Sequence, residues 1–264
     1  MNIKYLKSFL VGSTLAISSF SNAALIYDTD VTNEVIFGSG NSNGSFSVVQ
    51  DSGIEIGLRG KLRHNAIGAA ENTFNSNGNG TYSFDAGVAP TQAAPTAVWS
   101  FEWSINSNFD GTGGFLNDYR YLLSIDTDPS AVTSFLNFDP INDINPGSGF
   151  LAWDHSIGNN GTVNGAGIES SSSDAATYAG LISSNNIAQN SWKPHWFIPG
   201  FDPTVDGTYN FALTAMDANG ANLASTSIQI IVGAGATAVP EPSTLAIFAL
   251  GMIGLASRRF KKQS

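Results

Sequence analysis

A chain of 264 residues is long enough for one large domain or two small ones. It contains no cysteine, which excludes disulfide bonds, thiolate nucleophiles and cysteine-ligated metal sites. Residues 24–237 hold only five of the 11 Lys and Arg residues but 20 of the 21 Asp and Glu residues, so their formal charge of about −15 repels nucleic acid and anionic lipid as direct partners.

The segment 1–23 has the pattern of a secretory signal peptide. Two lysines precede a short apolar stretch at residues 9–17, which is too short to cross a membrane. Ser21 and Ala23 place small side chains at positions −3 and −1 of a cleavage site. We therefore predict that signal peptidase cuts before Ala24.

The segment 24–237 alternates apolar and polar side chains, as β-strands with one buried face do. In residues 99–105, large apolar side chains alternate with Ser100, Glu102 and Ser104. Because a sheet with one apolar face must pack on a second sheet, we expect an all-β domain, a β-sandwich of Ig-like or jelly-roll-like type. The predicted strands cover residues 46–49, 54–58, 81–84, 99–105, 119–125, 209–215 and 228–232, with Gly- and Asn-rich turns between them.

One short helix is expected, capped by Ser173 or Asp174 and with its apolar face in residues 178–182. Towards the end of the domain, residues 206–215 followed by 225–232 resemble the closing hairpin of bacterial Ig-like sandwiches. This resemblance supports the sandwich architecture and implies nothing about function.

Acidic residues gather in two predicted turns, Asp126 with Asp128 and Asp139 with Asp143. Hard oxygen ligands on loops suit Ca²⁺, so these four residues form a candidate calcium site. The same residues are typical of turns in which a carboxylate caps a strand end and no metal is bound, and this is the favoured of the two interpretations. No other cofactor is predicted.

Trp192 and Trp196 lie in an aromatic cluster at residues 192–197. If exposed, their rings could stack on the C–H faces of sugars. If buried, they would instead anchor a loop in the core, as large aromatic side chains often do. Their solvent exposure distinguishes a carbohydrate site from a purely structural cluster.

Patterns that indicate catalysis are missing from the sequence. The histidines His64, His155 and His195 lack the spacing of metal ligands. Glu102 stands alone on its strand, without a second carboxylate for a glycosidase pair. We therefore expect a protein that is not an enzyme.

The segment 238–264 has three parts in a fixed order: a Pro-Glu-Pro motif, an apolar run at residues 245–256, and a basic cluster. This order resembles the PEP-CTERM sorting domain. The resemblance implies processing by exosortase near the motif, in Gram-negative bacteria that also export polysaccharide. The residues that match are Val239, Pro240, Glu241 and Pro242, followed by Arg258, Arg259, Lys261 and Lys262.

The apolar run indicates transient rather than permanent insertion in the inner membrane. Its residues would reach roughly 18 Å as a helix, which is short of a hydrocarbon core of about 30 Å. The basic cluster holds its end of the run in the cytoplasm. The protein is then expected at the outer surface or outside the cell.

The favoured hypothesis is an exported, exosortase-processed protein with a structural or interaction role at the cell surface or in a biofilm matrix. The alternative is a carbohydrate-binding module for the exported polysaccharide, with Trp192 and Trp196 as stacking rings. An extracellular hydrolase is the least supported of the three, since it would need a catalytic carboxylate pair.

Overall fold

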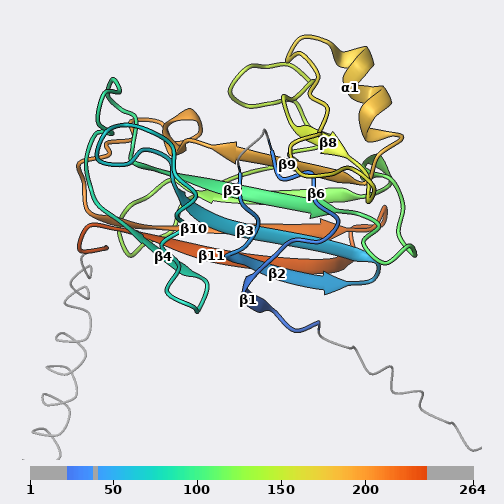
Figure 1. Cartoon of the computed structure of the whole chain (residues 1–264), viewed down its shortest axis with the longest axis horizontal. Coiled ribbons are helices and arrows are strands. Elements are labelled where there is room, and N and C mark those ends of the chain that lie inside the picture. Colours follow the sequence, from blue (N-terminus) through green and yellow to red (C-terminus); the bar gives the residue numbers. More distant parts are fainter. Residues whose placement is uncertain (1–22, 38–40, 237–264) are drawn as a thin grey trace, which may run out of the picture.

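The computed structural model describes residues 23–37 and 41–236, which form two β-sheets and one short α-helix (Figure 1). The elements are β1 (Ile26–Thr29), β2 (Phe46–Asp51), β3 (Ile54–Leu62), β4 (Thr81–Phe84), β5 (Trp99–Asn106), η1 (Leu116–Asp118), β6 (Arg120–Asp126), β7 (Phe135–Phe138), β8 (Ser156–Gly158), α1 (Ala175–Ile182), β9 (Ile187–Trp192), η2 (Pro194–Trp196), β10 (Gly207–Met216) and β11 (Asn222–Val232).

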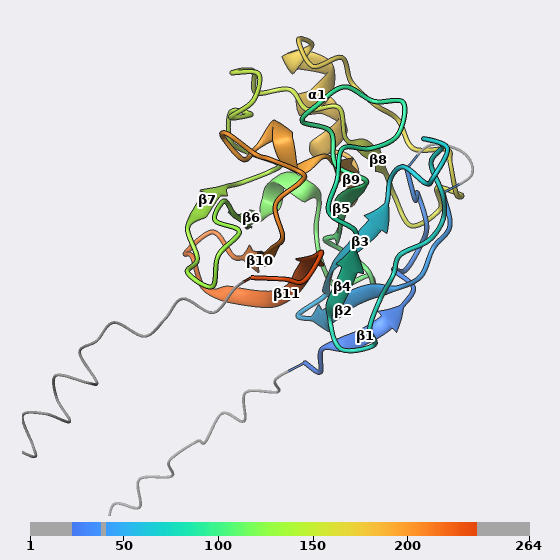
Figure 2. The same ribbon diagram turned by 90° about the vertical axis from the view of Figure 1, so that its left-hand side faces the viewer.

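The two sheets lie face to face as the layers of a sandwich (Figure 2). The six-stranded sheet has the order β1-β2-β3-β5-β9-β8, and the five-stranded sheet has the order β4-β11-β10-β6-β7. Strand β4 runs parallel to β11, whereas the other paired strands run antiparallel. The predicted all-β sandwich with a short helix is confirmed.

Strand β5 supplies the aromatic centre of the core. Phe101 stacks on Phe211 of β10 with ring centroids 4.5 Å apart, and Trp99 lies 5.5 Å from Tyr209 on the same strand. All four side chains are at least 98 % buried. Each such burial stabilises the fold by roughly 1.5–3 kcal/mol, which replaces what disulfides provide in other exported domains.

A second aromatic group surrounds His155, which is fully buried. Its imidazole stacks on Trp153 at 5.3 Å and meets the edge of Trp103 at 4.7 Å. The Nε2–H group donates to the carbonyl of Pro140 at 2.7 Å, and Nδ1 lies 3.1 Å from the side-chain nitrogen of Asn190. These contacts fit the neutral imidazole with its proton on Nε2, and burial lowers the pKa of His155 to about 3.

Helix α1 covers one end of the sandwich, beside β8 (Figure 1). Asp174 caps it by accepting a hydrogen bond from the Thr177 amide at 3.0 Å, as predicted. Tyr178 is buried beneath the helix, and its hydroxyl donates to the Ile141 carbonyl at 2.8 Å. The helix thereby fastens the loop after β7 to the aromatic group around His155.

The seven strands predicted from the sequence are present, with ends that differ by a few residues. Strands β1, β7, β8 and β9 were not predicted. Strand β9 is a central strand whose residues do not alternate, because both of its faces are covered and polar Gln189 is as buried as Ala188.

The buried His155 gives the first prediction. A histidine whose pKa is lowered in the folded state contributes stability above its unfolded pKa of about 6.5, and that stability is lost as the pH falls towards 3. At pH 5 the loss should be about 2 kcal/mol. Denaturant titrations at pH 7 and pH 5 should therefore show a smaller pH dependence for His155→Gln than for the wild type.

The matched control is His195→Gln, because His195 is only partly buried whereas His155 is fully buried. It should keep most of the wild-type pH dependence. Equal pH dependence in the wild type and in His155→Gln would contradict the prediction that protonation of His155 causes the loss of stability at low pH.

Candidate functional site

The outer face of the six-stranded sheet is polar yet buried. On β5, the side chains of Ser100, Glu102, Ser104 and Asn106 point away from the aromatic core and are all at least 98 % buried. The segment before β2 covers this face through hydrogen bonds to Arg59 and Gln189, and Phe74, which follows β3, covers it through a ring contact with Arg59. The outer face of this sheet is therefore also buried, and charged, hydroxyl and amide groups line it.

An ion pair between Arg59 of β3 and Glu102 of β5 lies at the centre of this face. The two residues are opposite each other in the antiparallel register, and neither side chain is exposed. Both Nε and Nη2 of Arg59 lie 2.6 Å from the same oxygen, Glu102 Oε2. Burial lowers the pKa of Arg59, and the neighbouring carboxylate of Glu102 opposes that shift.

The Arg59 guanidinium also holds the covering segments in place. Its Nη1 donates to the carbonyl oxygens of Ser42 and Gly44 at 3.0 and 2.6 Å. Its planar group lies between two rings, 4.1 Å from the centroid of Phe46 and 3.9 Å from that of Phe74. Such stacking adds roughly 1–2 kcal/mol when the cation is desolvated.

Lys61 occupies the next outward position on β3. Its ammonium lies 3.5 Å from Glu102 Oε1 and also donates to the side-chain oxygen of Asn41. Burial lowers the pKa of Lys61, the charge of Glu102 raises it, and the cations Arg59 and Arg63 lower it further. Glu102 is thus shared between two cations, but its Oε1 accepts no hydrogen bond in the structure.

Gln189 of β9 extends the polar face to the next strand. Its Nε2 donates to the Glu34 carbonyl and to Ser104 Oγ, both at 3.0 Å. Since a backbone carbonyl only accepts, the contact with Glu34 fixes which end of the amide is the nitrogen. The amide oxygen Oε1 is buried and has no hydrogen-bond partner.

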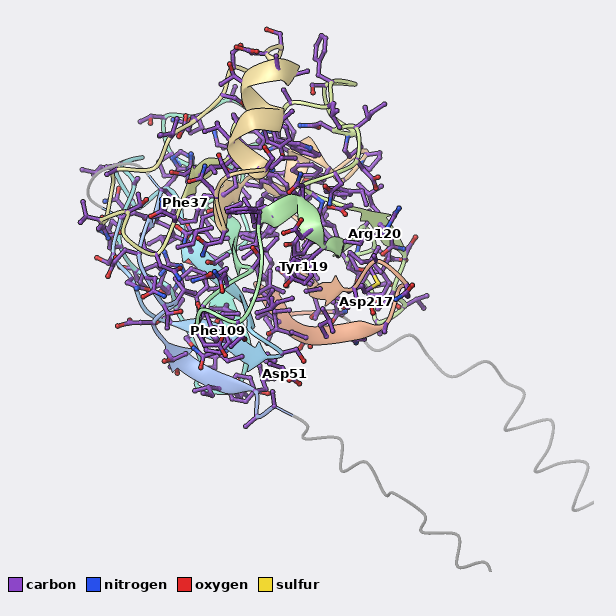
Figure 3. All side chains as sticks on the ribbon, turned by 90° about the vertical axis from the view of Figure 1, so that its right-hand side faces the viewer. Phe37, Asp51, Phe109, Tyr119, Arg120 and Asp217 are labelled. Carbon is purple, nitrogen blue, oxygen red and sulfur yellow. The ribbon has the colours of Figure 1, made fainter. Side chains whose placement is uncertain are left out.

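These groups form the floor of a pocket of about 400 Å³, here named the Glu102 pocket. Figure 3 labels one of its lining residues, Phe37, on the side of the six-stranded sheet, away from Arg120 and Asp217 on the side of the five-stranded sheet. The exposed acidic residues Glu71, Asp154 and Glu169 lie at the rim. The pocket is lined by Phe37, Asn41, Lys61, Arg63, Ala70, Glu71, Asn72, Glu102, Asp154, Ser156, Glu169, Gln189, Asn190, Ser191 and Trp196.

Trp196 is the large aromatic residue at the rim, and 49 % of it is exposed. It ends the short helix η2, which begins at Pro194 because proline suits the first position of a helical turn. The Lys193 ammonium lies 5.8 Å from its ring centroid. Trp196 also borders a second, more apolar groove that contains Phe135 and Phe201.

Trp192 requires a correction to the prediction that paired it with Trp196 as a sugar-stacking ring. Only 3 % of Trp192 is exposed, and its ring packs against Phe197 at 4.7 Å and Trp103 at 5.3 Å. It belongs to the aromatic core. The register of β9 against β5 explains this, because Trp192 is opposite the core residue Phe101.

The four candidate calcium ligands hold backbone turns. Asp126 Oδ1 accepts hydrogen bonds from the amides of Asp128 and Ser134 at 3.2 and 3.0 Å. Asp139 Oδ1 accepts from two amides that follow it in the chain, and Asp143 Oδ2 accepts from the amide of Asp139 at 2.8 Å. Burial raises the pKa of Asp139, while its hydrogen bonds oppose the shift.

Within the described part of the chain, no three His, Asp or Glu side chains come together as a metal-binding group. The structure therefore does not assemble the four carboxylates into the predicted calcium site. It uses them as caps for two separate turns, which was the other interpretation of the same residues.

The processing signals fall largely outside the described residues. Of the predicted signal-peptidase site, Ala23 and Ala24 are described and Ser21 is not. The whole tail from residue 238 onward is also outside. Among the residues that the structure does describe, no helix is long and apolar enough to cross a membrane.

Comparison with known families decides the nature of the tail. Residues 238–262 match the model of the PEP-CTERM protein-sorting motif. The chain carries a PEP-CTERM sorting motif. This confirms the resemblance seen at Val239–Pro242 and in the basic cluster, and it makes the protein an exported one that exosortase sorts to the surface. No curated protein matches the chain, so the PEP-CTERM match informs the routing and leaves the sandwich to be interpreted from its own geometry.

The buried ion pair gives the second prediction. Arg59→Met leaves Glu102 buried without its main partner, and we expect the free energy of unfolding to fall by about 3–5 kcal/mol. Arg63→Met is the matched control, since the half-buried guanidinium of Arg63 donates to the neutral Ser191 Oγ, and the loss of that hydrogen bond should cost about 1 kcal/mol. Similar losses in the two variants, measured by denaturant titration at pH 7, would contradict a central role for the pair.

Proposed function

We infer that the mature protein is a non-catalytic, cell-surface or matrix interaction protein that binds carbohydrate in the Glu102 pocket. The observation that supports this most directly is the combination of half-exposed Trp196 at the rim with buried Glu102 and Gln189 at the floor. An indole face suits the C–H face of a sugar ring. Carboxylate and amide groups suit its hydroxyls. Exosortase sorting to the surface would bring this pocket to polysaccharide that the cell exports.

The charge of the domain limits the other partners that can be proposed. A region with a formal charge of about −15 repels nucleic acid and anionic lipid, so a polar, uncharged polymer is the better match. The pocket is concave and its floor is preformed by the Arg59–Glu102 pair, as binding sites for small ligands usually are. Binding without reaction is proposed because, among the described lining residues, Glu102 alone places a carboxylate at the floor, and Arg59 already occupies its Oε2.

Trp196 gives the third prediction. Trp196→Ala should weaken the binding of the cell's exported polysaccharide, measured by isothermal titration calorimetry, by about tenfold, which corresponds to ~1.4 kcal/mol of lost stacking. The matched control is Phe115→Ala, since Phe115 is equally exposed but does not line the Glu102 pocket. The sugar should be recovered unchanged after incubation. Equal affinity of both variants would contradict the site, and cleavage of the sugar would contradict a binding role.

The PEP-CTERM tail gives the fourth prediction. Glu241→Ala should reduce release of the protein while leaving its thermal unfolding unchanged, if exosortase recognises that carboxylate within the motif. Deleting residues 258–262 should let the chain pass uncut, because the basic cluster no longer holds that end in the cytoplasm.

The measurement is the intact mass of the surface or released protein in strains with and without exosortase. The expected product begins at Ala24 and lacks the basic cluster. A product from the exosortase-competent strain that still contains Arg258 to Ser264 would mean that the tail is a permanent anchor.

A further inference from the structure

We propose that the Glu102 pocket selects an uncharged sugar residue. The hydroxyl groups of that sugar would donate hydrogen bonds to Glu102 Oε1 and Gln189 Oε1. This inference rests on the proposed carbohydrate-binding function and narrows its ligand class. It excludes two kinds of sugar that surface polysaccharides commonly contain: those with a carboxylate and those with a free ammonium group.

The first argument comes from two buried hydrogen-bond acceptors at the floor of the pocket. Glu102 is fully buried and Gln189 is 1 % exposed, and both line the pocket. Among the residues that the structure describes, none donates a hydrogen bond to Glu102 Oε1 or to Gln189 Oε1, although the Lys61 ammonium lies 3.5 Å from Glu102 Oε1. A buried acceptor without a donor destabilises the protein, so a ligand that supplies the donor removes that cost on binding.

Both of these atoms are acceptors, so the ligand must offer hydrogen-bond donors. The carboxylate of Glu102 can only accept because Arg59 and Lys61 surround it with positive charge. The amide of Gln189 cannot turn to present its nitrogen, because that nitrogen donates to the Glu34 carbonyl. The ligand must therefore bring O–H or N–H donors, and a uronate carboxylate, which only accepts, would face two acceptors.

The two acceptors are close enough to serve one sugar residue. Gln189 lies opposite Ser104 on β5, and Glu102 is two positions away on that strand and the same face. Diagonal neighbours of this kind are about 7–8 Å apart in an antiparallel sheet, and their side chains can converge on one ligand. Trp196 lines the same pocket, so its indole could stack on the ring face of the same sugar residue or of the next one in the chain.

The second argument comes from the charges around the site. At the floor, the cations Arg59 and Lys61 flank Glu102 and would repel a ligand ammonium group. Towards the rim, the three exposed carboxylates of Glu71, Asp154 and Glu169 outnumber the half-buried cation Arg63, and their net negative charge would repel a ligand anion. A charged sugar therefore meets like charge either on entry or at the floor, whereas a neutral one meets neither.

The test uses the exported protein and sugars that differ in one group. Calorimetry would compare oligosaccharides of equal length: oligomers of glucose, galactose and mannose as neutral probes, oligogalacturonate as the acidic counterpart of galactose, and oligoglucosamine as the cationic counterpart of glucose. We expect at least one neutral oligomer to bind at least tenfold more tightly than its charged counterpart. Its affinity should change less than twofold between 50 and 500 mM salt, since no net charge is neutralised.

Two variants examine the recognition itself. Gln189→Leu removes one acceptor and should weaken binding of the neutral oligomer at least tenfold. Lys61→Met leaves the Arg59–Glu102 pair intact but removes the cation 3.5 Å from Oε1. It should therefore shift selectivity towards oligoglucosamine over the glucose oligomer by several fold, which a purely structural effect of Lys61 would not do.

The outcomes separate this inference from the proposed function. If oligogalacturonate or oligoglucosamine binds as tightly as the neutral oligomers and Trp196→Ala abolishes that binding, the carbohydrate function stands and the selectivity proposal is wrong. An unchanged selectivity ratio in Lys61→Met also contradicts the selectivity proposal. If no oligosaccharide in the panel and no exported polysaccharide binds, both are overturned.

Discussion

A buried guanidinium group destabilises a fold unless charged and polar groups surround it, and the contacts of Arg59 come from four parts of the chain. It reaches Glu102 across the strand pair, the carbonyls of Ser42 and Gly44, and the rings of Phe46 and Phe74. Each partner is thereby fixed relative to β3. The covering segments, the floor of the Glu102 pocket and the register of β3 against β5 all depend on that one group.

The same requirement makes the register difficult to change. A shift of β3 by one residue would turn Arg59 towards the aromatic core and expose Leu58 to the polar face. The unpaired cation would then meet Phe101 and Phe211 rather than a carboxylate. Burying an unpaired charge costs several kcal/mol. The ion pair therefore disfavours sheets with a shifted register as well as stabilising the correct register.

Much of the fold could be predicted from period-two alternation, because strands such as β5 and β10 bury one apolar face in the core. Strand β9 could not, since its outer face is covered by protein and Gln189 is buried there like an apolar residue. Trp192 and Trp196 look alike in the sequence, and only the position of Trp192 opposite Phe101 decides which one is in the core.

The polar pocket was missed for a related reason, although the sequence contained a signal. Three of the five basic residues of the mature region, Arg59, Lys61 and Arg63, recur at every second position directly after the strand predicted at residues 54–58. Such charges on one face need anions nearby, and Glu102 alone on its strand was the available partner. The pairing needed the long-range register of β3 and β5, which local patterns do not contain.

The end of β11 has a consequence for how exosortase meets its substrate. Residues 233–239 connect Val232, the last residue of β11, to the Pro-Glu-Pro motif, and a fully extended chain of that length covers at most about 25 Å. β11 pairs with both β10 and β4, so the sandwich closes only after this last strand has left the membrane. Exosortase therefore acts close to the folded sandwich. The size and charge of the end of the sandwich near Val232 then limit how the enzyme can approach the motif.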